Sequence, residues 1–250
     1  MKLPMFCLKS KVMLIGIDVC HAGTNSVVGF VATTNMQFTS HYSDIIIQPK
    51  NVEIVKKDLD TCLVKALNDF QMNCGSLPDK IIIYRDGLGE QQRDQSIDKE
   101  VTQLKESLIG KYNKINPPKI TLIVVNKRIN QRMFCQERGQ VVNPPPGTII
   151  DKKLVENTDD KCFDFFLVPQ QTTVGCVKPT HFYVALNESY DEITKQDIEN
   201  LTFCQTFMYS NWSGSIKVPA VCQLAHKIAD YHFTFDKCGL LKKSKVETKQ

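Results

Sequence analysis

The sequence lacks most of the short motifs by which enzymes are recognised. No apolar run reaches the 18 residues that a membrane-spanning helix needs, so we expect no membrane span. No C-x-x-C pair is present and no Cys/His set has zinc-site spacing, so the ten cysteines are expected to be reduced thiols. The absence of G-x-S-x-G, P-loop and G-x-G-x-x-G motifs argues against a serine hydrolase, a P-loop nucleotidase and a dinucleotide-binding enzyme.

A strong net charge is also missing. The chain carries 31 basic and 27 acidic side chains, a net charge of +4, so only a local basic patch could bind a phosphate backbone. The apolar run at 12–17 is short, is followed directly by Asp18 and has no small-residue cleavage site, which argues against a signal peptide. We therefore expect a cytoplasmic or nuclear protein.

Two apolar stretches each end in an aspartate. They are 12–18 (VMLIGID) and 81–86 (IIIYRD). Because an unpaired carboxylate is costly to bury, the pattern is easiest to explain if Asp18 and Asp86 share a cation at the edge of a sheet. Such a site suggests Mg²⁺ or Mn²⁺ chemistry on phosphate esters. The alternative is that each aspartate only caps the turn or helix after its strand.

The periodicity of the chain predicts an α/β fold. Strands are predicted over 12–20, 27–34, 38–47, 80–84 and 120–125, and helices over 52–72, 97–112, 194–209 and 219–232. Short turns between the first three strands favour an antiparallel meander, and the strand–helix–strand connections that follow favour parallel pairing. We therefore predict a mixed five-stranded sheet flanked by helices. Two strand-like runs follow at 164–169 and 181–186, and a polar tail over 237–250, most strongly charged from Lys242, is expected to be disordered.

Two carboxylates alone bind a metal weakly, so His226 and Glu53 are further candidates. His226 lies on an otherwise apolar helical stretch, where the alternative is a structural core histidine. Glu53 begins the predicted helix 52–72, where the alternative is an acid favoured by the helix dipole. His21, three residues past Asp18, is expected to be structural or exposed.

Basic residues gather after the fifth predicted strand, at Lys127, Arg128 and Arg132. The carboxyl ends of parallel strands form the ligand-binding edge of such a sheet, so this cluster is expected near Asp86. There it would contact a phosphate backbone without reading sequence. The alternative is an ordinary solvated loop. Weaker candidates of the same kind are Lys178 and Lys227.

Several segments, in this order, resemble the PIWI domain of the Argonaute/Piwi family, and its Piwi branch in particular. They are 16–21 (GIDVCH), 81–87 (IIIYRDG), 127–130 (KRIN), 143–151 (NPPPGTIID) with 163–168, 175–183 (GCVKPTHFY) and 209–226 (YSNWSGSIKVPAVCQLAH). The resemblance implies a ribonuclease H-like fold over 1–236. It also implies a small guide RNA and a complementary target RNA as partners, with silencing-complex proteins, and, in active members, cleavage of the target by two magnesium ions.

The resemblance also implies the site residues. Asp18 and Asp86 match the family's aspartates, His226 matches in its Ala-His-Lys context, and the glutamate of the tetrad falls near Glu53, one residue from the ungapped spacing. Asp18, Asp86 and His226 would hold Mg²⁺ or Mn²⁺, and Glu53 would orient the attacking water. The sequence departs from the family in two ways. Family members carry N-terminal, PAZ and Mid domains before this one, and they normally end in an apolar segment, whereas residues 237–250 are polar here.

Two other functions stay open at this point. The domain could be a non-cleaving module that holds a guide–target duplex and recruits silencing partners. It could also be a ribonuclease H-like nuclease that acts without a guide on any RNA–DNA hybrid.

Overall fold

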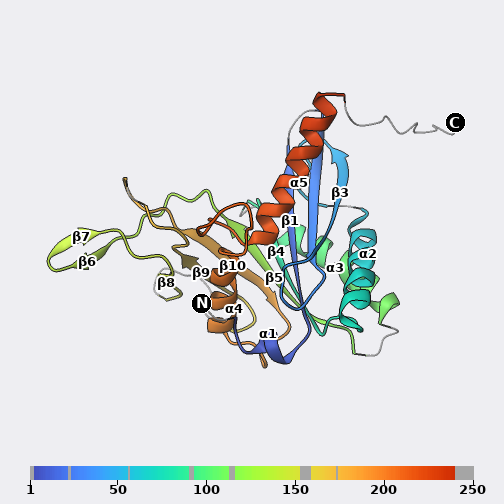
Figure 1. Cartoon of the computed structure of the whole chain (residues 1–250), viewed down its shortest axis with the longest axis horizontal. Coiled ribbons are helices and arrows are strands. Elements are labelled where there is room, and N and C mark those ends of the chain that lie inside the picture. The colour runs from blue at the N-terminus through green and yellow to red at the C-terminus, as the bar shows by residue number, and fades with distance from the viewer. Residues whose placement is uncertain are drawn as a thin grey trace.

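An eight-stranded mixed sheet forms the centre of the protein (Figure 1). The computed structural model describes residues 3–21, 24–55, 57–89, 93–112, 116–152, 159–172 and 174–239. The strands of the sheet are β1 (Val12–Cys20), β2 (Asn25–Thr33), β3 (His41–Pro49), β4 (Lys80–Asp86), β5 (Lys119–Asn126), β8 (Ile149–Ile150), β9 (Phe163–Leu167) and β10 (Thr180–Asn187). Their order is β3-β2-β1-β4-β5-β10-β9-β8. The pairs β1–β4 and β4–β5 are parallel, and the other neighbours are antiparallel.

The predicted meander, the parallel pairing and the α/β class are confirmed, but the predicted count of five strands is wrong. The two strand-like runs after β5 are β9 and β10, and β10 pairs antiparallel with β5. Their aromatic side chains drive this extension, because Phe163, Phe165 and Phe182 are all buried. The third strand begins at His41 rather than at residue 38, since Phe38 has a φ of 59°.

Helices cover both faces of the sheet. They are α1 (Phe6–Lys9), α2 (Leu59–Cys74), α3 (Arg93–Lys111), α4 (Lys195–Gln205) and α5 (Ala220–Lys237). A separate hairpin, β6 (Cys135–Glu137) with β7 (Gln140–Val142), projects from the body (Figure 1). The predicted helix start at residue 52 is wrong. Val55 is anchored in the core and Asp58 has a left-handed φ of 66°, so α2 cannot extend back beyond Leu59, and Glu53 lies in the loop before it.

The alternation of side chains along β1 and β4 sorts residues between these helices. Met13, Ile15 and Ile17 enter the core built with α2 and α3, whereas Val12 and Leu14 enter the core built with α4 and α5. Successive strand side chains point to opposite faces. The pattern therefore turns Asp18 and Asp86 toward α5. Arg85, which precedes Asp86, is turned toward α3.

Two glycines let α5 lie directly against the sheet (Figure 1). A β-carbon at Gly16 would lie 2.2 Å from the carbonyl oxygen of Val221, and one at Gly29 would lie 1.9 Å from that of Ala225. Such distances are shorter than any real contact, so only glycine permits this approach. Because His226 follows Ala225, the same contact determines where that histidine lies.

No helix in the described ranges is both long enough and apolar enough to cross a membrane. Cys7, Cys62, Cys74, Cys135, Cys176, Cys222 and Cys238 are free thiols. Of the predicted tail 237–250, Lys237 is the last residue of α5 and residues 238–239 are also described, whereas 240–250 lie outside the described residues.

Candidate active site at the strand ends

Asp18 and Asp86 lie side by side at the carboxyl ends of two neighbouring parallel strands. The register pairs Ile17 with Arg85, so the residues that follow are neighbours across β1 and β4. The two aspartates are only 5% and 2% exposed. From α5, Nδ1 of His226 lies 2.7 Å from Oδ2 of Asp18. Three residues that are far apart in the sequence therefore meet at one sheet edge.

The electrostatics of this edge are those of crowded acids. Burial, and then the charge of Asp18, raise the pKa of Asp86. Nζ of Lys127 lies 2.5 Å from Oδ2 of Asp86. Burial opposes the charge of Lys127, but the attraction of Asp86 outweighs it, and the pKa of Lys127 is raised. The hydrogen bond to Asp18 is the main cause of the raised pKa of His226. Cations are therefore stabilised beside the carboxylates.

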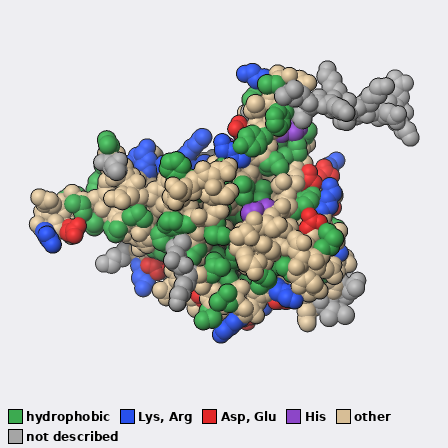
Figure 2. Space-filling view, in the orientation of Figure 1, with side chains coloured by type: hydrophobic (Ala, Val, Ile, Leu, Met, Phe, Trp, Pro, Cys, Tyr) green, Lys and Arg blue, Asp and Glu red, His purple; other side chains and the backbone are tan. Residues whose placement is uncertain are grey.

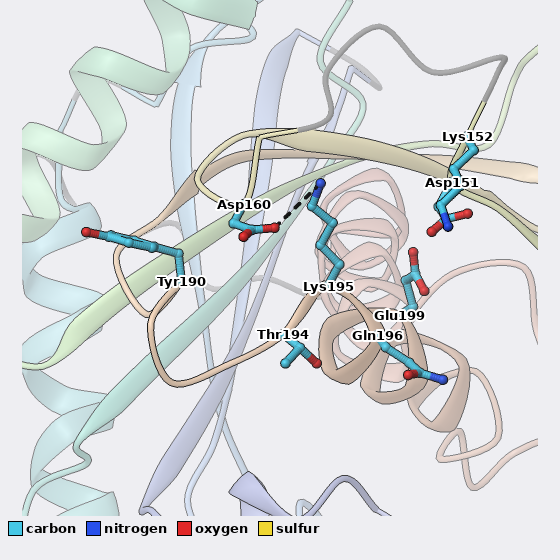
Figure 3. A pocket seen from close by; sticks show the side chains of 8 residues that line it. All are labelled: Asp151, Lys152, Asp160, Tyr190, Thr194, Lys195, Gln196 and Glu199. Carbon is cyan, nitrogen blue, oxygen red and sulfur yellow. Dashed lines mark ion pairs between the residues drawn. The ribbon is translucent and has the colours of Figure 1, made fainter.

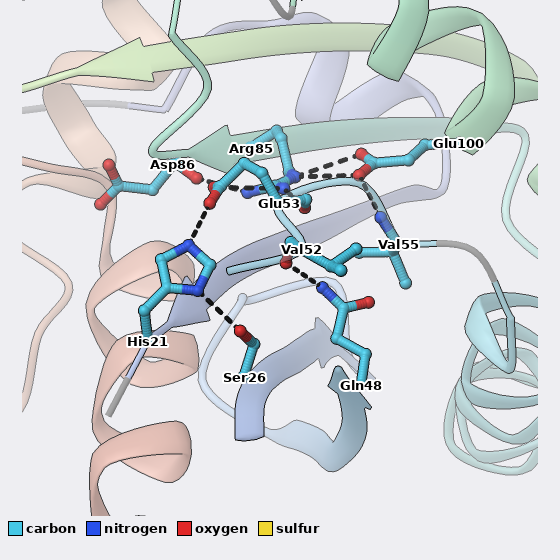
Figure 4. A network of polar contacts seen from close by, with 9 residues as sticks. All are labelled: His21, Ser26, Gln48, Val52, Glu53, Val55, Arg85, Asp86 and Glu100. Carbon is cyan, nitrogen blue, oxygen red and sulfur yellow. Dashed lines mark hydrogen bonds and ion pairs between the residues drawn. The ribbon is translucent and has the colours of Figure 1, made fainter. Parts of the chain in front are cut away.

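Glu53 reaches the same site from the loop between β3 and α2 (Figure 4). Its Oε2 lies 2.5 Å from Nε2 of His21, whose Nδ1 lies 2.7 Å from Oγ of Ser26. Nη2 of Arg85 lies 3.6 Å from Oε1 of Glu53 and donates a 2.7 Å hydrogen bond to its carbonyl oxygen. A β-carbon at Gly87 would lie 3.3 Å from Oε1 of Glu53 and 3.8 Å from Oδ1 of Asp18, so the loop carboxylate faces the strand carboxylates.

A cleft of about 520 Å³ joins these side chains. Its walls include all four predicted site residues. The charged and titratable side chains in its lining include Asp18, His21, Glu53, Asp86, Lys127 and His226. The structure thus brings the four predicted site residues to one cleft, together with His21, for which the sequence predicts no role in the site.

The predicted basic residues separate into two groups. Lys127 and Arg128 line the cleft, and Arg128 is exposed at it. Arg132 instead donates hydrogen bonds of 2.8–3.3 Å to carbonyl oxygens of residues 129–131 and so stabilises its own loop. Lys178 is exposed and Lys227 is half-buried, and neither lines the cleft.

The donor set fits a hard divalent cation. Carboxylate oxygens with an imidazole are ligands that Mg²⁺ or Mn²⁺ accepts, and Asp18 and Asp86 lie buried side by side with His226 next to them. Among the described residues, however, no three His, Cys, Asp or Glu side chains lie in an arrangement that could hold a metal ion as it stands. Two of the carboxylates have other partners, since Lys127 contacts Asp86 and His21 contacts Glu53.

A second polar pocket lies at the start of α4 (Figure 3). Its lining includes Asp151, Asp160, Lys195 and Glu199, and Nζ of Lys195 lies 3.6 Å from Oδ1 of Asp160. Glu199 is 6% exposed, and its Oε1 has no hydrogen-bond partner in the described structure. Burial, and then the charge of Asp151, raise the pKa of Glu199 to about 7. The acids of this pocket lie outside the cleft and therefore serve as controls for the acids of the cleft.

A mixed sheet covered by helices on both faces, with acids paired at the carboxyl ends of its parallel strands, defines a ribonuclease H-like domain with a candidate metal-dependent site. Comparison with known proteins leads to the same class of domain. The chain belongs to the Piwi domain family, whose model matches residues 2–236. Piwi-like protein 1 of Gallus gallus is 41% identical over 225 residues, which is 88% of this chain and 25% of that protein.

Solved structures give the same result. Drosophila Piwi has a TM-score of 0.75 at 32% identity, covering 91% of this chain and 30% of that one. Kluyveromyces polysporus Argonaute with a guide RNA has a TM-score of 0.79 at 26% identity, covering 91% of this chain and 27% of that one. The resemblance predicted from the sequence is therefore confirmed. The chain spans about a quarter of the length of the curated relatives it matches.

Proposed function

We propose that this chain is the target-cleaving part of a small-RNA-guided silencing protein, with a divalent-metal-dependent endoribonuclease site. One observation carries the proposal: Asp18, Glu53, Asp86 and His226 come from β1, the β3–α2 loop, β4 and α5, and they line one cleft. Paired acids at a sheet edge, with a histidine and a third carboxylate, suit the hydrolysis of a phosphodiester.

In this proposal Asp18, Asp86 and His226 hold Mg²⁺ or Mn²⁺. The metal, when bound, would activate water and stabilise the charge on the leaving 3′ oxygen. Glu53 orients the attacking water, and His21 and Arg85 hold that carboxylate in place. Because Asp18 and Asp86 are almost fully buried, their oxygens are kept in one orientation by the sheet and not by solvent.

The proposed partners are a small guide RNA and its complementary target RNA. A guide RNA is present in the solved Kluyveromyces polysporus Argonaute. Lys127 and Arg128 lie at the cleft, where cations can contact a phosphate backbone without reading its sequence. Lys and Arg side chains also gather along the upper edge of the face in Figure 2, between the β6–β7 hairpin and α5. Other silencing-complex proteins and a cytoplasmic or nuclear location belong to the same proposal.

A second candidate function is a non-cleaving module that binds the guide–target duplex. The contact between Lys127 and Asp86 favours it, because an ammonium group on this carboxylate competes with a metal for the same oxygen.

A cleavage assay distinguishes the two functions. The full chain is mixed with a pre-annealed guide–target RNA duplex and Mn²⁺, as wild type, as Asp86→Ala and as the control Asp160→Asn, which changes an acid of the second pocket. We expect cleavage by wild type and the control. Asp86→Ala should lose several kcal/mol of charge stabilisation, about 10³-fold in rate, with RNA binding retained.

Duplex binding without cleavage in all three proteins would support the non-cleaving module instead. Equal cleavage of an RNA–DNA hybrid that contains no guide sequence would support an unguided nuclease.

A further inference from the structure

The loop that carries Glu53 is tied to the fold on both sides of that residue. On one side, Nε2 of Gln48, from β3, donates a 2.5 Å hydrogen bond to the carbonyl oxygen of Val52 (Figure 4). At the glutamate itself, Arg85 donates to the carbonyl oxygen of Glu53. On the other side, the backbone of Val55 is held by α3. A loop this strongly bonded through its backbone has few alternative positions.

Helix α3 contacts Val55 through two side chains one turn apart. Oε1 of Glu100 accepts a 3.1 Å hydrogen bond from the Val55 N–H, and Nε2 of Gln103 donates a 2.7 Å hydrogen bond to the Val55 carbonyl oxygen. Residues at i and i+3 lie on one helix face, so both can reach the same peptide segment. The Val55 side chain is fully buried, which leaves its backbone groups dependent on these partners rather than on water.

Glu100 also holds Arg85, which contacts the loop that carries Glu53. Nε of Arg85 lies 3.1 Å from Oε2 of Glu100, and the two residues are 0% and 2% exposed (Figure 4). Nη1 of the same guanidinium donates a 2.5 Å hydrogen bond to the carbonyl oxygen of Asp86. One buried carboxylate on α3 thus connects the strand that carries Asp86 with the loop that carries Glu53.

We propose that Glu100 and Gln103 of α3 are positioning residues that hold the β3–α2 loop, and through it the carboxylate of Glu53, at the cleft. Neither residue lines the cleft, so each acts through Val55 or Arg85. The catalytic consequence rests on the cleavage activity proposed above, because a misplacement of about 1 Å can reduce a rate about 100-fold.

The first test measures loop opening without using activity. Gln103→Glu keeps the shape of the side chain but removes the N–H donor, and Gln103→Lys restores a donor. Glu106→Gln, on the exposed face one turn further along α3, is the control. Amide exchange at Val55 in the full chain should become about tenfold faster in Gln103→Glu, and should be near wild type in Gln103→Lys and in the control.

Unchanged exchange at Val55 in Gln103→Glu overturns the proposal, and so does an equal increase in Glu106→Gln. Glu100→Gln is the second variant. This variant keeps an acceptor for the Val55 N–H but removes the charge that pairs with Arg85. Because the loss of a buried ion pair can destabilise the whole fold, the melting temperature of the variant is measured together with its amide exchange.

The second test uses the cleavage assay. In Gln103→Glu we expect kcat to fall about tenfold with KM for the duplex unchanged, and Gln103→Lys to restore kcat. Faster exchange at Val55 with a wild-type kcat overturns the positioning role. If wild type itself does not cleave, the proposed function fails, whereas the exchange experiment still decides whether α3 holds the loop.

Discussion

The carboxylates of the cleft are held in two different ways. Asp18 and Asp86 belong to strands whose backbones are bonded on both sides by the sheet, and their direction follows from the alternation of strand side chains. Glu53 belongs to a loop, and its position depends on side chains from three other elements: His21 after β1, Arg85 on β4 and Glu100 on α3.

This difference explains which parts of the site are set by local sequence and which by long-range contacts. A strand-end aspartate is placed by the same backbone hydrogen bonds that form the sheet, so it needs no dedicated partners. A loop glutamate needs several partners, each of which must itself be fixed. We therefore expect the loop side of the cleft to be easier to displace than the strand side.

The largest effect on stability is expected where α5 packs against the strands. Gly29→Ala would place a β-carbon 1.9 Å from the carbonyl oxygen of Ala225, so α5 must move away from β2, and His226 with it. We expect the free energy of unfolding to fall by about 1–3 kcal/mol in chemical denaturation. The control is Gly110→Ala on α3, where an added β-carbon meets nothing within 4 Å. That change should be neutral or stabilising by about 0.5–1 kcal/mol. Equal destabilisation by both changes would show that α5 is not placed by contact at Gly29.

The sequence predicted the strand side of the site well. The apolar run-ups to Asp18 and Asp86 are local signals of buried parallel strands, and their acidic ends needed no knowledge of the rest of the fold. His226 could not be assigned in this way, because a histidine on an apolar helix is usually structural. Its assignment came from the family resemblance, and the reason it lies beside Asp18 is the long-range contact of α5 with Gly16 and Gly29.

The loop side was predicted less well. Ile54 and Leu59 fit a helical period with the residues of α2, so the pattern predicts a helix that includes Glu53. The buried Val55, which interrupts that helix, gives no local signal. His21 was expected to be structural or exposed. It is exposed, but it also contacts Glu53. The available signal was its place three residues after Asp18, directly beyond the strand end.

A smaller effect on stability is expected at Glu199, a buried carboxylate that lies outside the cleft. Because the pKa of Glu199 is raised from 4.5 to about 7, the folded state keeps a proton there that the unfolded state has lost, and stability falls as pH rises through this range. Gln at this position mimics the protonated form, so Glu199→Gln should flatten the decline between pH 5 and pH 7.

The expected gain at pH 7 is on the order of 1 kcal/mol, reduced by the partial access of solvent to the pocket. Thermal melts across this pH range measure it, and cleavage should not change. A parallel pH dependence in wild type and variant would mean that Glu199 ionises normally.

Binding of Mn²⁺ to the full chain, measured by calorimetry, tests most directly whether the two kinds of carboxylate serve one site. We predict saturable binding by wild type, a loss of affinity of at least about 100-fold in Asp86→Asn, and a smaller loss of about tenfold in Glu53→Gln. Binding by Asp86→Asn that equals that of wild type would contradict the account.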